Sequence, residues 1–456
     1  MMKRFISEIR DRPRGWLVLL SFAAALHVVV STGVFVIGRL GLMPSQFDRN
    51  GWGKFASDSY AYQQDIMNLT DKLIHAGAGA WLKSVAPWHV RLYSLSHSIF
   101  RHWTSPNVLT IEPLNLFYYL AILFLVFKLG ERLFDRLSGA LAMTIVALWP
   151  SFLLHTTQLL RDPLLILAIL VFVLVISGWL TEDYSYRRSA VVIVPAVLAV
   201  VTIWIVRLAM WDIVRMVMTM GLALLVLRLL RERRLLRGNI INAVVLIGVI
   251  ILIPLFKPML EALQRRGDQA TIAEDVADLS VWDRIALRRQ GFANLKKDQL
   301  NAAASNIDED VQFNGKTDVI LYLPRACAIG LLAPFPNLWF VKGSQVGSPG
   351  RLLSGGETLL TYVLELLALI SLWQMRKNLA VWLLVATVVC GVTALGLIVL
   401  NIGAFYRLRY PYWMLIVVLG TGGAIKIMRR SAPGLADSQC VKKLSSLKSN
   451  LSNQEP

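Results

Sequence analysis

Apolar runs of about 20 residues recur along the chain and alternate with shorter polar segments. Each run is long enough to cross a hydrocarbon core of about 30 Å as a helix. The pattern predicts about ten crossings, at residues 16–42, 113–129, 137–154, 163–180, 190–205, 213–230, 240–256, 357–374, 379–400 and 410–427. We therefore expect an all-α polytopic membrane protein.

Two long polar segments interrupt the pattern, residues 43–112 after the first run and 257–356 after the seventh. An interfacial helix is expected at 62–80 and an amphipathic helix at 280–300. Residues 320–340 are apolar but contain three prolines. If this stretch crossed the membrane once, the basic Arg376-Lys377 pair and the basic C-terminus would both lie outside. We therefore interpret it as a re-entrant or interfacial element.

The charge distribution predicts the orientation. The chain is 56% hydrophobic and 17% charged, with a formal net charge of +18, and its cations lie mostly at the ends of apolar runs. Cations in that position mark the cytoplasmic side, so both termini are expected in the cytoplasm and both long polar segments outside. The same placement argues against nucleic acid as a partner. Residues 1–430 are expected to form one transmembrane domain and residues 431–456 a disordered cytoplasmic tail.

Common catalytic and metal-binding motifs are missing from the sequence. The three cysteines, Cys327, Cys390 and Cys440, have no metal-site spacing. The histidines of residues 43–112 have no HExxH spacing, and no GxSxG, Walker or GxGxxG element is tied to a soluble domain. Candidate chemistry therefore rests on isolated charged residues near the ends of the apolar runs.

Asp58 is the most suggestive acid, in the stretch FDRNGWGKFASDSYAY at 47–62. A carboxylate where an outer loop meets the bilayer can act as a general base toward a hydroxyl or hold a divalent cation. The Ser-Asp-Ser sequence is also good turn chemistry, so a helix N-cap or a solvated loop acid is the alternative. Asp65 and Asp71 are expected on the polar face of the following helix.

A second acid, Asp162, follows Arg161 in the short turn before the fourth run. Asp162 could cap that helix, with Pro163 as its first residue. The same geometry would let Asp162 face Asp58 and Arg161 reach a phosphate. His155 and Gln158 are neighbours in this turn.

Three more arginines lie at expected outer helix ends, where cations are disfavoured. Arg207 follows the fifth run, and Arg407 and Arg409 belong to YRLRYP at 406–411, expected as a short outer loop before the last run. Guanidinium forks suit phosphate or pyrophosphate. Contact with lipid headgroups is the alternative for all three.

This combination resembles the GT-C-fold membrane glycosyltransferases, especially the protein-mannosyltransferase-like members of bacterial envelope polysaccharide pathways. The resemblance rests on the long first outer loop with Asp58, the 150–162 turn, the large segment after the seventh run, and NxGxxYRxRYP at 401–411. It covers about residues 15–430. The chain departs from the family in having a lone acid in the first loop and no large soluble domain after the last run.

The resemblance implies a polyprenyl-phosphate sugar as donor, used at the outer face of the plasma (inner) membrane. Asp58 and Asp162 would be the catalytic carboxylates, with Asp58 acting as base on the acceptor or orienting it, and Arg161, Arg207, Arg407 and Arg409 would bind the donor phosphate. The residues expected to line the site or contact the acceptor are Tyr60, Tyr62, His155 and Gln158. The metal requirement, including a divalent cation, stays open, as does the choice among glycan, lipid and protein acceptors.

Three rival functions remain beside a membrane glycosyltransferase. A polysaccharide polymerase or ligase would use arginines on polyprenyl-pyrophosphate glycans, and would tolerate loss of Asp58. A lipid or glycan translocator would carry charged residues near the middle of several helices, whereas here the charges gather at helix ends. A non-catalytic scaffold would consume no lipid-linked sugar.

Overall fold

The computed structural model describes residues 15–56, 58–256, 279–294, 306–340 and 347–431. Within these ranges the chain is helical, with two isolated backbone bridges and no β-strand. Nine described helices are long and apolar enough to cross a membrane, and a bent pair would make a tenth. The expectation of an all-α polytopic membrane protein is confirmed.

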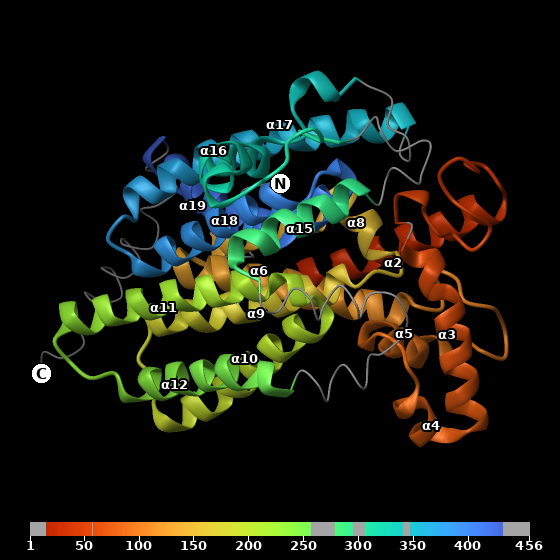
Figure 1. Cartoon of the computed structure of the whole chain (residues 1–456), viewed down its shortest axis with the longest axis horizontal. Helices are drawn as coiled ribbons and strands as arrows, with labels where there is room; N and C mark the ends of the chain where they lie inside the picture. Colours follow the sequence, from red (N-terminus) through yellow and green to blue (C-terminus); the bar gives the residue numbers. More distant parts are fainter. Residues whose placement is uncertain (1–14, 57, 257–278, 295–305, 341–346, 432–456) are drawn as a thin grey trace, which may run out of the picture.

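The membrane-length helices share a length of at least 20 residues. They are α2 (Gly15–Arg39), α6 (Glu112–Leu133), α9 (Asp162–Thr181), α10 (Tyr186–Val206), α11 (Trp211–Glu232, preceded by η2 at Leu208–Met210), α12 (Arg237–Leu252, continued by η3 at Ile253–Phe256), α17 (Gly347–Gln374), α18 (Leu379–Ile398) and α19 (Ile402–Ser431). Figure 1 shows α10 and α12 on one flank, α16 and α17 on the other, and α6 and α9 between them. Helices α9 and α19 are the most buried of the nine.

The third predicted crossing is not one straight helix. Helix α7 (Arg136–Ala147) and helix α8 (Pro150–Thr156) are bent by 68° at a short break. Pro150 accounts for the break, because its ring fixes φ and removes a backbone donor while suiting the first turn of a new helix. The expectation of a single helix at 137–154 is corrected accordingly.

Two other expected boundaries are also corrected. Helix α19 begins at Ile402 and contains the 406–411 segment, which was expected to form a loop. Asn401 explains the earlier start, because its side-chain oxygen accepts a hydrogen bond from the Ala404 N–H at 2.9 Å, as an N-cap residue does. Helix α17 begins at Gly347, so residues 347–356 belong to it and not to the preceding polar segment.

The 320–340 stretch forms helix α16 (Lys316–Leu332), followed by a short η5 turn at Pro336–Leu338. Helix α16 packs closely on α18, since a Cβ atom at Gly396 would lie 2.1 Å from the Ala326 carbonyl oxygen. Small residues permit such close approach of membrane helices. That this stretch is a re-entrant or interfacial element stays a prediction. Of the expected 280–300 helix, the structure describes α15 (Val281–Asn294), and the tail at 432–456 lies outside the described residues.

The first polar segment forms a small helical unit at one end of the bundle (Figure 1). It contains α3 (Asp58–His75), α4 (Gly77–Lys83) and α5 (Trp88–Ser98). The expected helix at 62–80 is broken at Gly77, which adopts a positive φ of 79° that favours glycine. This unit has its own apolar core around the fully buried Trp52 and Tyr93. We call this end of the bundle the Asp58 end.

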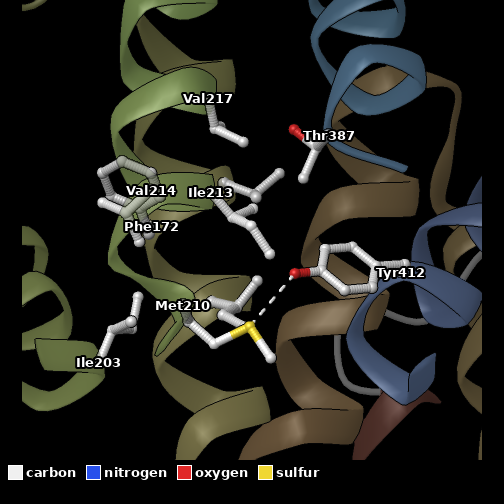
Figure 2. Close-up of a pocket in the computed structure, with 10 residues that line it drawn as sticks. Phe172, Ile203, Met210, Ile213, Val214, Val217, Thr387 and Tyr412 are labelled. Atoms are coloured by element: carbon white, nitrogen blue, oxygen red, sulfur yellow. Dashed lines mark hydrogen bonds between the residues drawn. The ribbon is translucent and has the colours of Figure 1, made fainter. Parts of the chain in front are cut away.

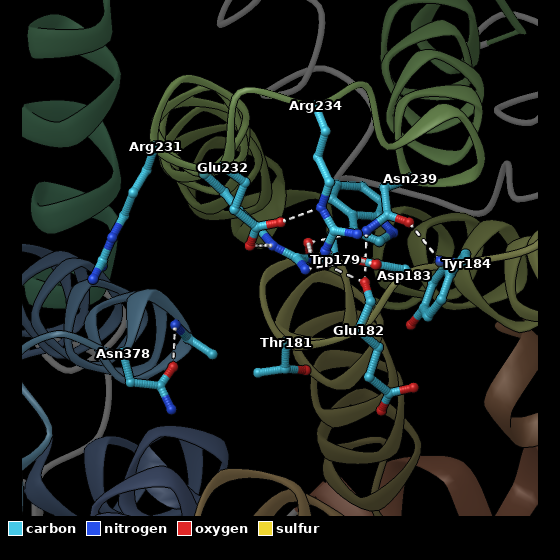
Figure 3. A network of polar contacts seen from close by, with 12 residues as sticks. Trp179, Thr181, Glu182, Asp183, Tyr184, Arg231, Glu232, Arg234, Asn239 and Asn378 are labelled. Carbon is cyan, nitrogen blue, oxygen red and sulfur yellow. Dashed lines mark hydrogen bonds and ion pairs between the residues drawn. The ribbon is translucent and has the colours of Figure 1, made fainter.

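A polar network lies at the opposite end, where the α9–α10 and α11–α12 connections meet (Figure 3). Arg228 donates to the carbonyl oxygens of Trp179 and Glu182 at 2.7 and 2.9 Å, and pairs with Asp183 at 2.7 Å. Asn239 donates to the same two carbonyl oxygens. These bonds satisfy carbonyl groups at the end of α9 that the helix itself leaves unpaired.

The apolar interior between the two ends is tightly packed. A void of about 10 Å³ among α9, α10, α11, α18 and α19 (Figure 2) has room for roughly one water molecule. Tyr412 points toward Met210 there, with its hydroxyl 3.9 Å from the sulfur atom. This void among the described helices is too small for a substrate.

Candidate functional site

Asp58 begins α3, and its neighbours hold it against the turn that precedes α9. The Ser59 hydroxyl donates to the Leu159 carbonyl oxygen at 3.2 Å, and the Gly53 N–H donates to the Gln158 side chain at 2.8 Å. Ser59 and Gln158 are fully buried. Residues about a hundred positions apart are thereby fixed together, and Asp58 lies beside the turn that carries Arg161 and Asp162.

Asp162 is the first residue of α9, with Arg161 in the N-cap position instead of Asp162 itself. A carboxylate is favoured there by the partial positive charge of a helix N-terminus. Its two oxygens lie 3.8 Å from nitrogens of Arg207 and Arg407, one oxygen facing each arginine. Arg207 is the C-cap residue that follows α10, so the contact joins α9, α19 and the end of α10.

Arg407 connects the two acids. Its Nη2 atom lies 3.4 Å from an Asp58 oxygen, while its Nη1 atom faces Asp162. Only 13% of the Arg407 side chain is exposed, and Nη1 has no hydrogen-bond partner among the described residues. The guanidinium therefore retains a donor for a further acceptor, such as a phosphate oxygen.

The cluster carries excess positive charge. Arg161 lies within electrostatic range of Arg207 and Asp162. With Arg407 and Asp58, three guanidinium groups and two carboxylates leave one positive charge. Burial and the neighbouring Arg161 lower the pKa of Arg207 to about 10, against the opposing effect of Asp162. Arg207 stays protonated at neutral pH, and an added anion would relieve the repulsion among the arginines.

Tyr62 and His89 form one side of this cluster. Their rings meet edge to face with centroids 4.7 Å apart. Burial, and to a smaller extent the nearby Arg161, lower the pKa of His89 to about 3, so the imidazole is neutral at neutral pH. Burial raises the pKa of Tyr62, which keeps its hydroxyl protonated. Tyr62 is one of the predicted lining residues that the structure places beside the charges.

Arg409 is not part of the cluster. Its guanidinium is buried and donates to the carbonyl oxygens of Leu331 and Ala333 at 3.1 and 2.6 Å. Because residues two apart on a helix point about 200° from each other, Arg407 and Arg409 cannot both face the two acids. The expected role of Arg409 in phosphate binding finds no geometric support.

The remaining predicted residues have structural partners. The Tyr60 hydroxyl donates to the Trp52 carbonyl oxygen at 3.2 Å, and Gln158 fixes the backbone of Gly51 and Gly53. His155 lies deeper, with Nδ1 2.6 Å from the Ser151 carbonyl oxygen and 2.9 Å from the Tyr410 hydroxyl. It remains within electrostatic range of Asp162.

Glu357 is a further buried acid that was not predicted from the sequence. One of its oxygens accepts the Ser151 N–H at 2.8 Å, and the other accepts the Tyr406 hydroxyl. The residue is buried beneath the cluster, and its two bonds join α17 to α8 and α19. A carboxylate well inside a membrane-length helix is a signal for function or structure. That signal was hidden because Glu357 was expected at a helix end.

His27 was also missed, although it lies in the middle of the first apolar run. Its Nδ1 atom is 2.7 Å from a Glu112 oxygen, and its Nε2 atom is 3.1 Å from the Thr156 hydroxyl. All three side chains are buried. They tie α2 to the start of α6 and the end of α8, which fixes the turn leading to Asp162.

The cluster suits an anion better than a cation. Among the described residues, no group of three histidine, cysteine, aspartate or glutamate side chains is arranged to hold a metal ion. Arg407 lies between the two carboxylates, and the three arginines outnumber them. No protein-family model, curated protein or solved structure matches this chain.

Proposed function

We propose that this protein is a membrane glycosyltransferase of GT-C type, which transfers a sugar from a polyprenyl-phosphate donor to an acceptor hydroxyl. The observation that carries the proposal is the convergence of Asp58, Asp162, Arg207 and Arg407 at one end of a bundle of membrane-length helices. A base beside a group of phosphate-binding cations is the minimum that such a transfer requires.

Four residues of the cluster have assigned roles in the proposed reaction. Asp58, whose side chain is 38% exposed, accepts the proton of the acceptor hydroxyl. The hydroxyl oxygen attacks the anomeric carbon, and the bond from that carbon to the donor phosphate oxygen breaks. Arg407 and Arg207 stabilise the departing phosphate, while Asp162 orients both guanidinium groups. Direct displacement of this kind inverts the anomeric centre.

The charge distribution supports an extracytoplasmic site. The basic 228–237 segment lies at the end of the bundle opposite Asp58. Cation-rich connections remain in the cytoplasm, so the Asp58 end would face outward. A donor with a prenyl tail would lie in the bilayer with its phosphate at this level. The plasma membrane and its lipids are then the natural setting of the enzyme.

The decisive experiment replaces Asp58 by asparagine in the full-length protein. Membranes with the wild-type protein should consume members of a radiolabelled panel of short-chain polyprenyl-phosphate hexoses. We expect Asp58→Asn to lower that rate at least about a hundredfold, the scale of loss of a general base. Asp310→Asn is the matched control, because Asp310 is exposed and lies outside the cluster.

Two results would contradict the proposal. Undiminished turnover by Asp58→Asn would remove the base from the mechanism, and would favour an arginine-based polymerase or ligase if Arg407→Ala alone were inactive. No consumption of any donor in the panel by the wild-type protein would favour a translocator or a scaffold.

A further inference from the structure

A second cavity lies outside the charged cluster, between α3 and the connection from α4 to α5. Its volume is about 340 Å³, within the range of small-ligand sites. The residues that line it are Asp65, Asn68, Leu69, Asp71, Lys72, Ser84, Val85 and Ala86. The proposed transfer chemistry uses none of these residues.

The cavity shares a helix face with Asp58. Asp65 and Lys72 follow Asp58 by seven and fourteen residues, and a spacing of seven returns to nearly the same side of an α-helix. At about 1.5 Å per residue, they lie roughly 10 and 21 Å along α3 from the proposed base. One face of α3 therefore runs from the charged cluster to the cavity.

Tyr62 lies between the two sites on the same face. It follows Asp58 by one helical turn and packs on His89 of α5, close to Ala86 in the sequence. It also lies within electrostatic range of Asp58 and Arg161. The charged cluster, Tyr62 and the cavity are thus consecutive along the interface between α3 and the α4–α5 region.

The lining chemistry suits a hydroxyl-rich ligand. Asp65 accepts hydrogen bonds, Asn68 and Lys72 donate them, and Leu69 with Val85 and Ala86 offers apolar contacts. Asp71 already accepts two hydrogen bonds from Arg101, at 3.0 and 2.8 Å, so it contributes less to a ligand. Sugar rings present this alternation of hydroxyl groups and C–H faces. A divalent cation would require an oxygen-only shell, which the Lys72 ammonium opposes.

The wall of the cavity opposite α3, residues 84–86, is held in place by hydrogen bonds to neighbouring residues. Arg91 is almost fully buried and donates to the Ser84 carbonyl oxygen, while its guanidinium lies 4.5 Å from the Trp88 ring centroid. The Ser84 hydroxyl donates to the Ala80 carbonyl oxygen at 2.9 Å. A fixed wall limits the ordering cost of binding.

We propose that this cavity binds the glycan chain of the acceptor, several sugar units away from the hydroxyl that reacts at Asp58. The inference rests on the proposed function, and it deepens that function by choosing a glycan among the possible acceptors. The separation along α3 means that the ligand extends beyond one sugar unit, and that the cavity sets acceptor affinity but not the chemical step.

Binding can be tested without catalysis. Full-length protein in lipid nanodiscs would be titrated with a panel of neutral linear hexasaccharides, with saturation-transfer NMR as the readout. We expect Asp65→Ala and Lys72→Ala to weaken binding at least about tenfold, the effect of losing one hydrogen bond to a charged group. The matched controls Asp310→Ala and Lys83→Ala, both exposed and outside the lining, should stay within about twofold.

The proposal is overturned if no hexasaccharide in the panel binds, or if Asp65→Ala and Lys72→Ala bind as the wild-type protein does. Binding of Mg²⁺ or Ca²⁺ that Asp65→Ala abolishes would overturn it in favour of a cation site. If the alanine variant does not fold, the same binding measurement would be made on Asp65→Asn, which preserves the shape of the side chain but removes its charge.

Kinetics separate this inference from the proposed function. With an active donor, Asp65→Ala should raise the acceptor KM at least about tenfold and leave kcat and the donor KM unchanged. Asp58→Asn should bind the hexasaccharides normally but fail to transfer. Loss of transfer in Asp58→Asn with a normal acceptor KM in Asp65→Ala would refute the glycan cavity alone. Normal transfer by Asp58→Asn would refute the proposed mechanism without affecting the binding result.

Discussion

Arg407 is the residue on which the candidate site depends most. It contacts both acids, it is mostly buried, and one of its nitrogens has no hydrogen-bond partner among the described residues. Removing the guanidinium would take away the proposed phosphate contact and leave Asp58 and Asp162 with less opposing charge. We therefore expect its loss to affect the proposed chemistry more than the loss of any single lining residue.

We expect Arg407→Ala to lower kcat/KM for the lipid-linked donor at least about a hundredfold, the scale measured when one preorganised donor is removed from a developing anion. Arg407→Lys should retain the positive charge but not the planar guanidinium fork, and we expect its kcat/KM for the donor to fall about tenfold. Steady-state transfer assays on purified protein would measure both. An Arg407→Ala variant that folds normally and stays within threefold of wild type would contradict the role.

Some residues of the charged cluster could be predicted from the sequence, but the residues that they contact could not. Asp58, Asp162 and Arg207 stand out because charges at the ends of apolar runs are conspicuous. Arg407 and Arg409 are indistinguishable while their segment is taken as a loop. Once Asn401 starts α19 early, helical phase turns one arginine to the acids and the other to the carbonyl oxygens of residues 331 and 333.

At the scale of elements, three helices meet just beneath the cluster. Glu357 of α17 accepts hydrogen bonds from α8 and α19, and the Tyr410 hydroxyl of α19 lies 2.9 Å from His155 of α8. Tyr406 and Tyr410 flank Arg407 along the chain. These contacts therefore fix the turn of α19 that presents Arg407 to the acids.

Glu357→Ala would leave the Ser151 N–H and the Tyr406 hydroxyl unpaired in a buried site. Each unsatisfied group costs about 1–3 kcal/mol, so we expect a clear fall in the unfolding temperature in detergent together with reduced transfer. Glu357→Gln keeps an acceptor and should be milder in both respects. Glu309→Ala, at an exposed position, is the control. Equal stability of Glu357→Ala and the wild-type protein would show that the hydrogen bonds of Glu357 do not stabilise the fold.

Hydrophobic periodicity predicted the existence of the membrane helices well, because a run of about 20 apolar residues has few alternatives. It predicted breaks and starts less well. Pro150 divides a run that is apolar on both sides, and Asn401 caps a helix whose first turns contain arginines and tyrosines. Both boundaries are set by single residues, to which a hydropathy pattern is insensitive.

At the scale of the whole molecule, two clusters of charged groups lie at opposite ends of the bundle. One end holds the arginine and aspartate cluster, and the other holds Arg228 with its carbonyl and carboxylate partners. Asp58 and Arg407 are 349 positions apart in the chain. The hydropathy pattern carries no information about contacts between distant residues, so this contact could be found only in the three-dimensional structure.

This division makes the orientation of the protein testable. After replacement of Cys327, Cys390 and Cys440 by serine, single cysteines would be placed at two exposed positions. One is Asp310, which closely follows the segment that pairs with the start of α19, and the other is Leu235, in the turn between α11 and α12. The basic residues around Leu235 should keep that turn in the cytoplasm. We therefore expect a membrane-impermeant maleimide to label Asp310→Cys in intact cells.

Leu235→Cys should react with the same reagent only after the membrane is permeabilised, which also shows that its thiol is accessible. The opposite labelling pattern would place the Asp58 end in the cytoplasm. The donor phosphate, the proposed base and the glycan cavity would then all face the cytoplasm. In that case an outward-facing transferase would be refuted even if every substitution in the cluster abolished activity, because the charges and the chemistry would lie on the wrong side of the bilayer.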